Sequence, residues 1–404
     1  MGSSPTVTRV VKGQLCTGCG LCAGLQPDSF KMEMVAPGYG RPRQFGPVDA
    51  AAERLIAAAC PGAVVAQWEG APNIHSSWGP WRRVATGYAT DPAVRHQASS
   101  GGALSALLIQ ALRSGRVDRV IHVAADPANP TANVMTCSTT EAEVLAAAGS
   151  RYASSSPLAV IDAVLSDGGA LAFVGKPCDV SALRRLGELD ARVARHVPLV
   201  LSFFCGGIPS QAGADRILAA MGVERRDLVA FRYRGNGWPG NAAATTQDGR
   251  VAEMSYAESW GDYLSHEVQF RCKICPDAVG GVADIACADA WYGDDKGYPS
   301  FEEKDGRSLI VARTALGVEL LAEAEAAGAL SVEALDIGEI DKMQPAQARR
   351  KQLVRARTAA LAATFQPQPD MRGTLVATAA RRASLREQLR NFLGTARRIV
   401  RGKR

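Results

Sequence analysis

Three cysteines at even intervals near the start of the chain carry the clearest chemistry. The run Cys16-Thr17-Gly18-Cys19-Gly20-Leu21-Cys22 spaces its thiols three residues apart, which lets one tight loop surround a cuboidal iron–sulfur cluster. Gly18 and Gly20 allow the backbone to turn that sharply. A zinc site usually takes two pairs of ligands and has little use for a third evenly spaced cysteine. The triplet therefore predicts a 4Fe–4S cluster rather than zinc.

Such a cluster needs a fourth ligand from outside the loop. Cys60 is followed by Pro61, and this Cys-Pro pair has the form in which ferredoxin-type loops supply their remote cysteine. The chain has ten cysteines, which in a cytosolic protein indicate metal or redox chemistry before disulfides. The predicted ligands of the first cluster are Cys16, Cys19, Cys22 and Cys60.

Four more cysteines lie near predicted strand ends or in a short paired motif. Cys272 and Cys275 form a C-x2-C pair, while Cys178 and Cys205 each lie at the end of an apolar stretch that reads as a buried strand. Two such loops and one C-x2-C loop can present four thiolates to a second 4Fe–4S cluster. The residues alone leave the alternative open that Cys178 and Cys205 are ordinary buried thiols and that the pair binds zinc.

A loop of small residues precedes a predicted helix over residues 103–112, which are apolar at helical intervals. Such a loop offers backbone N–H groups, hydroxyls and the positive end of the helix dipole, which together suit a phosphate or the edge of a flavin. Capping of the helix by one of the serines explains the same residues and, without other evidence, is the favoured interpretation. The loop consists of Ser99, Ser100, Gly101 and Gly102.

The elements that position these residues alternate between strand and helix. Residues 171–174 and 199–204 read as buried strands, residues 158–165 as a helix, and residues 283–294 as a strand ending in acidic residues. The Gly-rich, cationic turn at residues 232–240 is more often a solvated loop. This alternation predicts a mixed α/β fold. No full G-x-G-x-x-G motif supports a nicotinamide-binding Rossmann unit.

Length and composition set the broad class. A chain of 404 residues is longer than one core usually organises, and 47% hydrophobic with 21% charged residues is typical of globular proteins. No window supplies the roughly 18 uncharged apolar residues of a membrane span. The first residues lack the apolar core of a secretory signal. We therefore expect a cytoplasmic protein.

The positive charge is concentrated at the C-terminal end. Residues 349–404 carry 15 Lys plus Arg against two acidic residues, so that residues 1–348 are net negative although the chain is +6 overall. An apolar stripe at helical spacing runs from Leu385 to Val400 among these arginines. Such a helix suits an anionic membrane surface, a protein partner or nucleic acid, or is merely a solvated helix.

The remaining cysteines and the histidines give no further candidate site. Cys137 and Cys287 have no partner spacing, and we expect both to be core thiols. The chain's five histidines are scattered and give neither a metal-binding set nor a catalytic triad.

These motifs, in this order, resemble the coenzyme F420 hydrogenase/dehydrogenase beta subunit family, which includes 7-hydroxymethyl chlorophyll a reductase. The likeness covers roughly residues 10–345 and departs at Ala288-Asp289-Ala290-Trp291-Tyr292, where relatives often have Gly-Asp-Ala-Trp-Gly. The segments that carry it are the cysteine triplet, the serine–glycine loop and residues 149–152, 175–178, 204–206, 272–277 and 283–291.

The resemblance implies a flavin-binding α/β protein with iron–sulfur clusters. It implies that Cys178, Cys205, Cys272 and Cys275 hold the cluster near the flavin, and it adds Lys176 as a candidate catalytic residue that stabilises negative charge on the reduced ring. A structural salt bridge is the alternative role of Lys176. The implied FAD contacts are Ser99, Ser100, Gly101, Gly102, Ser150, Tyr152 and Lys176.

The resulting expectation is an FAD- and iron–sulfur-dependent oxidoreductase. Electrons would pass from ferredoxin or a partner subunit through two 4Fe–4S clusters to FAD and on to an organic two-electron acceptor such as coenzyme F420. The alternatives are a non-catalytic electron-relay subunit, or an iron–sulfur sensor or scaffold that uses its basic tail. A homo-oligomer and peripheral membrane contact through the tail are compatible with the sequence, whereas nucleic acid is a less favoured partner.

Four units follow from these assignments. They are a ferredoxin-like 4Fe–4S module over residues 1–80, the first part of the flavin-binding core over 81–168, the second part with the second cluster over 169–345, and a basic helical tail over 346–404.

Overall fold

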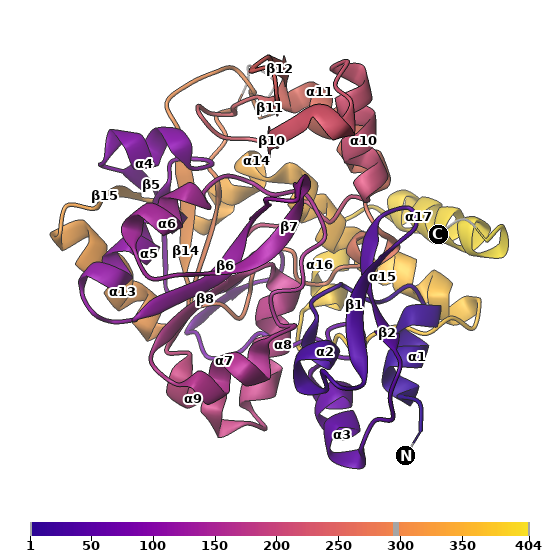
Figure 1. Ribbon diagram of the computed structural model, residues 1–404. Helices are drawn as coiled ribbons and strands as arrows, with labels where there is room; N and C mark the ends of the chain where they lie inside the picture. Colours follow the sequence, from indigo (N-terminus) through magenta and orange to yellow (C-terminus); the bar gives the residue numbers. More distant parts are fainter. Residues whose placement is uncertain (1, 294–298, 403–404) are drawn as a thin grey trace.

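The computed structural model describes residues 2–293 and 299–402 and is organised around an eight-stranded mixed sheet (Figure 1). The strand order is β15-β5-β14-β13-β9-β8-β6-β7. The central strands β13, β9, β8 and β6 are parallel, and every other neighbouring pair is antiparallel. The strands are β5 (Arg83–Ala89), β6 (Arg119–Asp126), β7 (Asn129–Ser138), β8 (Leu171–Gly175), β9 (Leu199–Phe203), β13 (Ile285–Asp289), β14 (Ser308–Ala312) and β15 (Leu330–Ala334). The expected mixed α/β fold is confirmed.

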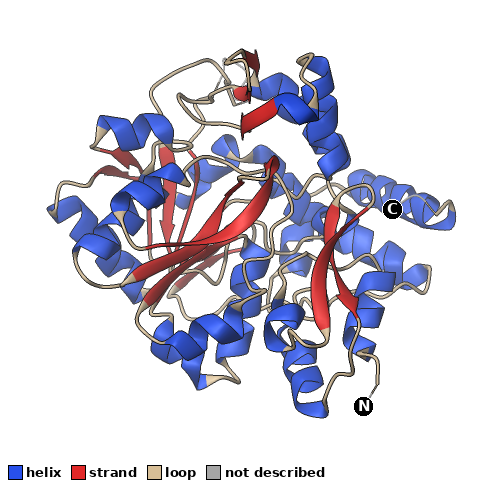
Figure 2. Ribbon diagram, in the orientation of Figure 1, coloured by secondary structure: helices blue, strands red, loops and turns tan. Residues whose placement is uncertain are grey.

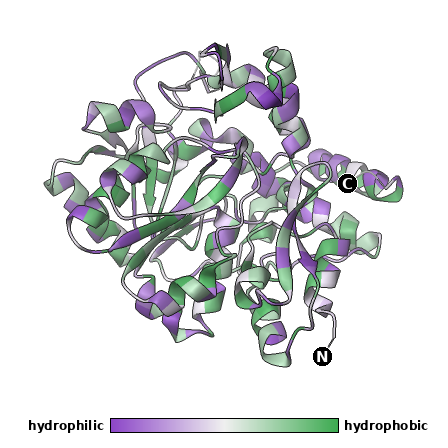
Figure 3. Cartoon of the chain, viewed as in Figure 1, coloured by the Kyte–Doolittle hydropathy of each residue, from purple (hydrophilic) through white to green (hydrophobic). Residues whose placement is uncertain are grey.

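Both faces of this sheet are apolar because helices cover both (Figure 2). In β8, Ala172 and Val174 join the core under α5 and α13, while Leu171 and Phe173 point the other way into the core under α7, α8 and α9. Figure 3 shows the middle of the sheet as mainly hydrophobic. The helices are α5 (Ala103–Arg113), α13 (Ala315–Ala326), α7 (Ile161–Asp167), α8 (Pro177–Gly187) and α9 (Ala191–His196).

The predicted strands at 171–174 and 199–204 and the helix at 103–112 are present as β8, β9 and α5. The helix predicted over 158–165 begins three residues late, as α7, because Val160 before it has a non-helical φ of −122°. The strand predicted over 283–294 ends at Asp289, and Asp294 lies outside the described residues.

The two cysteines outside the cluster sets differ in burial. Cys137 is exposed on the edge strand β7, so the prediction of a core thiol is wrong for it, whereas Cys287 is buried in β13.

The N-terminal segment packs directly against the sheet. Cys19, Leu21 and Ala59 share one core with Phe173 of β8, and α3 contacts α8. A hairpin and a second short strand pair complete the segment. Its elements are α1 (Pro5–Lys12), α2 (Leu21–Leu25), β1 (Phe30–Val35), β2 (Tyr39–Gln44), α3 (Ala50–Ala59), β3 (Asn73–His75) and β4 (Gly79–Trp81).

Three further groups of elements complete the fold. A three-stranded antiparallel sheet has the order β10-β11-β12, and the C-terminal helices α15 and α17 pack along each other at one edge of the molecule (Figure 1). The remaining elements are α4 (Pro92–Gln97), α6 (Glu141–Ala146), α10 (Gln211–Ala220), β10 (Leu228–Arg232), β11 (Ala242–Thr246), β12 (Val251–Met254), α11 (Tyr256–Glu258), α12 (Phe270–Lys273), α14 (Ile340–Met343), α15 (Pro345–Ala363), α16 (Val376–Ala380) and α17 (Leu385–Val400), with short turns η1 (Arg225–Asp227), η2 (Ser259–Tyr263), η3 (Leu264–Glu267) and η4 (Ile337–Glu339). None of the described helices has the length and apolar character to cross a bilayer.

Candidate functional site

The first cysteine group forms where the loop between α1 and α2 meets the end of α3. Cys60 ends α3 as its C-cap, and Gly20 begins α2 with a left-handed φ of +86°. A Cβ on Gly20 would lie 2.8 Å from the backbone nitrogen of Ala159, so the close packing of this loop requires glycine. The loop and α3 therefore hold the four cysteines at one place.

Burial and the closeness of the four cysteines to one another both raise the pKa values of these thiols. Burial and, to a smaller extent, the neighbouring Cys16 raise the pKa of Cys60 to about 11. The pKa of Cys22 is raised well above its ordinary value by burial and by the charges of Cys19, Cys16 and Cys60. Each of the four thiols is thus within electrostatic reach of the others. Four buried thiols become thiolates readily only when a bound metal compensates their charge.

The second cysteine group gathers at the carboxyl ends of two parallel strands. Cys178 lies in the first turn of α8 after β8, and Cys205 follows β9. Cys272 lies in α12, and Cys275 follows it and donates through Sγ to the Asp277 carbonyl at 2.9 Å. Because the carboxyl ends of parallel strands meet at one sheet edge, these distant segments come together there.

The electrostatics show that this second set is also one group. Burial, together with the smaller effects of Cys272 and Cys275, raises the pKa of Cys205 to about 12 against the opposing charge of Arg350. The pKa of Cys178 is raised well above its ordinary value, first by burial and also by Cys205 and Cys275. The structure therefore brings together both sets of four that the sequence analysis grouped.

Two buried charged residues lie between the groups. Asp179 raises the pKa of Cys19 in the first group and of Cys178 in the second, in both cases as a smaller effect than burial. Arg271 donates to the carbonyl of Pro61 at 2.9 Å, directly beside Cys60, and it lowers the pKa of Cys275 against the larger effect of burial. The two cysteine groups are therefore neighbours, separated by single side chains.

Two sets of four cysteines are a donor set of the kind that 4Fe–4S clusters use. Across residues 2–293 and 299–402, no three His, Cys, Asp or Glu side chains converge on the position of a single metal ion. Within the same ranges, the buried Thr17 Oγ1 and Arg271 Nε have no hydrogen-bond partner. Both can donate to cluster sulfur, a contact that tunes such centres. The residues present therefore fit two 4Fe–4S clusters.

A cavity of about 850 Å³ lies beside the second group, within the range of small-molecule and cofactor sites. It is lined by Cys205 and Cys287 and reaches the C-terminal helices at Arg349 and Arg350. Of the residues that the family resemblance implies for flavin, six line the cavity, namely Ser99, Ser100, Gly102, Ser150, Tyr152 and Lys176.

Gly101 is not among the lining residues because it packs inward against the sheet. A Cβ on Gly101 would lie 2.8 Å from the Gly87 carbonyl oxygen and 2.9 Å from the Ser308 nitrogen. Ser100 beside it adopts a left-handed φ of +60°, and Gly102 one of +75°. The loop is therefore held tightly on strands β5 and β14, and its serines face the cavity.

The helix after this loop is not capped by the loop's own serines, so that interpretation is wrong. Gly102 is the N-cap of α5 and provides no side chain, and Ser308 Oγ accepts instead from the N–H groups of Gly101 at 2.9 Å and Ala103 at 3.4 Å. The amides of Leu104 and Ser105 have no carbonyl within the helix to accept them, and both residues line the cavity. Ser99 and Ser150 share a hydrogen bond of 2.7 Å.

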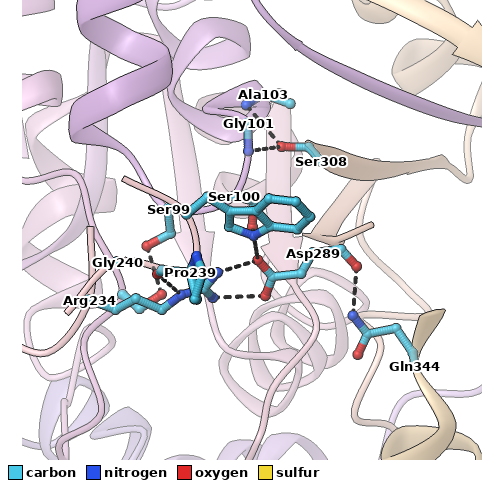
Figure 4. Close-up of polar contacts among 12 residues, drawn as sticks. Ser99, Ser100, Gly101, Ala103, Arg234, Pro239, Gly240, Asp289, Ser308 and Gln344 are labelled. Carbon is cyan, nitrogen blue, oxygen red and sulfur yellow. Dashed lines mark hydrogen bonds and ion pairs between the residues drawn. The ribbon is translucent and has the colours of Figure 1, made fainter. Parts of the chain in front are cut away.

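A buried ion pair fixes the loop from the opposite side (Figure 4). Arg234 donates to both carboxylate oxygens of Asp289, at 2.8 and 2.5 Å. Asp289 also accepts from Ser100 Oγ and Trp238 Nε1, each at 2.7 Å, and its backbone carbonyl accepts from Gln344 at 2.7 Å. Although burial opposes the charge of Asp289, Arg234 and these donors hold its pKa below the ordinary value.

The interpretation of residues 232–240 as a solvated loop is therefore wrong. Arg234 and Trp238 are each 2% exposed, and Trp238 stacks on Trp291 with ring centroids 4.8 Å apart. An arginine and a tryptophan in a Gly-rich turn were the available signal. Their partner Asp289 lies 55 residues beyond Arg234 and 51 beyond Trp238, and a single sequence gives no means of pairing them.

Lys176 joins the cavity to the space between the cysteine groups. Its Nζ donates to Asp179 Oδ2 at 2.6 Å and to Ser155 Oγ at 2.8 Å. Burial opposes the ammonium charge, but the Asp179 carboxylate outweighs it and holds the pKa of Lys176 above its ordinary value. A fixed positive charge thus lies in the wall of the cavity.

Comparison with known proteins gives matches over most of the chain. Residues 84–162 match the N-terminal part, and residues 168–337 the C-terminal part, of the family described as "Coenzyme F420 hydrogenase/dehydrogenase, beta subunit". The first cysteine group and α15 to α17 lie outside these two ranges.

Curated proteins and solved structures are similar to this chain, among them the following three. The coenzyme F420 hydrogenase subunit beta of Methanococcus voltae is 27% identical over 265 residues, which are 64% of this chain and 86% of that protein. The F420-dependent formate dehydrogenase 1 subunit beta of Methanococcus maripaludis is 26% identical over 250 residues, which are 61% of this chain and 60% of that protein. A chain of the F420-reducing [NiFe] hydrogenase complex from Methanosarcina barkeri has the same fold, with a TM-score of 0.57, 21% identity, and coverage of 74% of this chain and 98% of that one.

Proposed function

Because the chain belongs to the coenzyme F420 hydrogenase/dehydrogenase beta subunit family, whose members are subunits of oxidoreductases, we propose that it is an iron–sulfur flavoprotein oxidoreductase. A redox role follows from the family. The finer proposal is that two 4Fe–4S clusters and FAD take electrons from ferredoxin or a partner subunit to an organic two-electron acceptor. One observation carries it, namely that two sets of four cysteines assemble side by side and the second borders the cavity.

The first cluster would be held by Cys16, Cys19, Cys22 and Cys60, and the second by Cys178, Cys205, Cys272 and Cys275. When bound, clusters supply one-electron transfer and FAD converts single electrons into a hydride equivalent. The protein's part is to hold these groups close together and away from water. The electrostatic effect of Asp179 on both Cys19 and Cys178 supports a route in which the first group leads to the second.

The cavity residues would bind and orient the flavin. Ser99, Ser100 and Ser150 offer hydroxyls, and the first turn of α5 offers free amides that suit a phosphate or a ring carbonyl. Lys176 places a positive charge in the wall, which favours negative charge on whatever ring lies against it. Its ion pair with Asp179 fixes the position of that charge.

Anaerobic purification with iron, sulfide and flavin analysis tests the proposal. We expect Cys19→Ser and Cys178→Ser each to lose about half of the iron, because each removes a ligand from a different cluster. Cys137→Ser is the matched control, since this exposed thiol belongs to neither group and should leave the iron content unchanged. Protein that contains zinc, or no iron, after such purification contradicts the proposal.

The relatives are named as subunits, and this favours one alternative, a relay subunit that carries clusters but reduces no acceptor itself. The flavin assay separates the two functions. Flavin released from the purified protein supports the flavoprotein, whereas clusters without flavin and without turnover of any two-electron acceptor support the relay subunit.

A further inference from the structure

Helix α17 exposes a continuous apolar stripe. Leu385, Leu389, Leu393 and Val400 are 87%, 59%, 56% and 81% exposed. With 3.6 residues per turn, these positions fall on one side of the helix, together with Ala396. Soluble chains rarely leave so many large aliphatic side chains together in water without a binding role.

The stripe does not serve the packing of the helix. The opposite side of α17 lies on α15, where Arg349 pairs with Glu387 at 2.9 Å and Gln388 donates to the Gln352 carbonyl at 3.0 Å. A capping box of Ser384 and Glu387 begins the helix. The contacts that hold α17 in place therefore use these polar residues and the apolar side chain of Ile399, which packs against the core that contains Leu361 of α15. They leave the leucines of the stripe exposed.

Arginines flank this stripe along its whole length. Each follows an apolar residue of the stripe by one position, which places it about 100° further round the helix. They are exposed, and none of them pairs with an acidic group in the described ranges. The one acidic residue of the helix, Glu387, is engaged on the opposite side with Arg349. The flanking arginines are Arg386, Arg390, Arg397 and Arg401.

A row of leucines beside a row of unpaired arginines matches the surface of an anionic bilayer. The aliphatic side chains suit the boundary between headgroups and acyl chains, and the guanidinium groups reach the phosphates at the same depth. Nucleic acid would engage the arginines but give the leucines nothing to bury against. A protein partner would need a wholly acidic rim around an apolar groove, whereas anionic lipid supplies both features.

We propose that α17 docks in the plane of an anionic phospholipid bilayer, with Leu385, Leu389 and Leu393 inserted among the acyl chains and the flanking arginines on lipid phosphates. The helix lies on the surface and does not cross it. Phe365, which follows the C-cap residue of α15, is 97% exposed. It lies at the same end of the helix pair as Val400, because Leu361 of α15 and Ile399 of α17 share one core. This docking goes beyond the redox function and does not depend on it.

Cosedimentation of the full-length protein with vesicles tests the proposal. We expect binding to phosphatidylglycerol–phosphatidylcholine vesicles and at least tenfold weaker binding to pure phosphatidylcholine. Removing three charges in R386Q/R390Q/R397Q should weaken binding about a hundredfold, at roughly fivefold for each arginine. Removing two apolar anchors in L389Q/L393Q should weaken it at least tenfold.

Matched controls separate docking from general surface effects. V229Q/V251Q changes two exposed valines on β10 and β12, at 51% and 56% exposure, and should bind as the native protein does. K31Q/R54Q/R195Q removes three exposed charges elsewhere and should lower binding by far less than the α17 triple. Circular dichroism and thermal melting establish that every variant is folded.

The proposal is overturned if the protein does not bind anionic vesicles, or if it binds anionic and zwitterionic vesicles equally. Native binding by L389Q/L393Q would also overturn it. So would a dimer of the free protein, detected by size-exclusion chromatography, that buries the leucine stripe. Tighter binding to duplex DNA than to vesicles, unaffected by L389Q/L393Q, would also assign the helix to nucleic acid instead.

Discussion

Lys176 Nζ lies 2.6 Å from Asp179 Oδ2 at the beginning of α8, and both side chains are almost fully buried, at 5% and 1% exposure. Asp179 also accepts from the Lys176 backbone N–H at 3.0 Å, so that it caps the helix and pairs with the ammonium at once. The same carboxylate acts electrostatically on Cys19 and Cys178. One ion pair thus joins the cavity wall to both cysteine groups.

Asp179→Asn is expected to destabilise the protein by about 3 to 5 kcal/mol, because it leaves the Lys176 charge buried without a counter-ion. Asparagine keeps the volume and the acceptor for the helix cap, so the loss reports the charge. Urea denaturation measures it. The double variant K176M/D179N should lose less than the sum of the two single variants, and additive losses would show that the pair is not coupled.

Asp289→Asn is expected to release flavin as well as to lower stability by about 3 kcal/mol. The carboxylate holds Arg234, Trp238 and the cavity-facing Ser100 together, so a neutral amide loosens the loop that we propose to bind FAD. The ratio of flavin to protein after purification and the affinity for added FAD check this. Asp262→Asn, at an exposed carboxylate, is the control, and an equal flavin content in both variants would contradict the prediction.

The sequence predicts those parts of the fold that depend on neighbouring residues. Strands β8 and β9 follow from short apolar stretches, and α5 follows from its 3.6-residue period. The grouping of Cys178 and Cys205 with the distant C-x2-C pair rested on resemblance, because spacing alone does not state which strand ends meet. The structure supplies that meeting through the parallel pairing of β8 and β9.

The parts that the sequence did not predict depend on contacts between distant segments. Ser308 replaces the expected cap of α5 from more than 200 residues away, and Arg234 is buried because Asp289 is placed opposite it by another strand. Cys137 looked like a core thiol because its neighbours are small or apolar. It is exposed because β7 is the last strand of its sheet, and strand order cannot be read from local sequence.

Gly20→Ala is expected to remove the first cluster and leave the second. The left-handed φ of +86° costs an alanine roughly 1 to 2 kcal/mol, and its Cβ would also meet the Ala159 nitrogen at 2.8 Å, which adds about 1 to 3 kcal/mol of overpacking. Gly222→Ala is the matched control, with a φ of +66° and open space around its Cβ. Iron analysis should show about half the native content in G20A only. Native iron content in G20A would place the ligands of the first cluster elsewhere.

His122 is expected to make the protein less stable in mild acid. Its side chain is buried in the wall of the cavity, with Nε2 2.7 Å from Ser138 Oγ of β7, and burial lowers the pKa of the imidazole from 6.5 to about 4. At pH values below the pKa of His122 in the unfolded chain, the unfolded chain binds a proton that the folded chain does not bind. The free energy of unfolding therefore falls as the pH drops from that pKa towards the pKa of His122 in the folded protein. The loss of unfolding free energy between about pH 7.5 and about pH 5 is about 2 kcal/mol.

His122→Gln keeps a partner for Ser138 but cannot titrate, so urea denaturation at both pH values should show a loss smaller by that amount than in the native protein. Equal losses in the two proteins would mean that the pKa of His122 is the same in the folded and the unfolded chain.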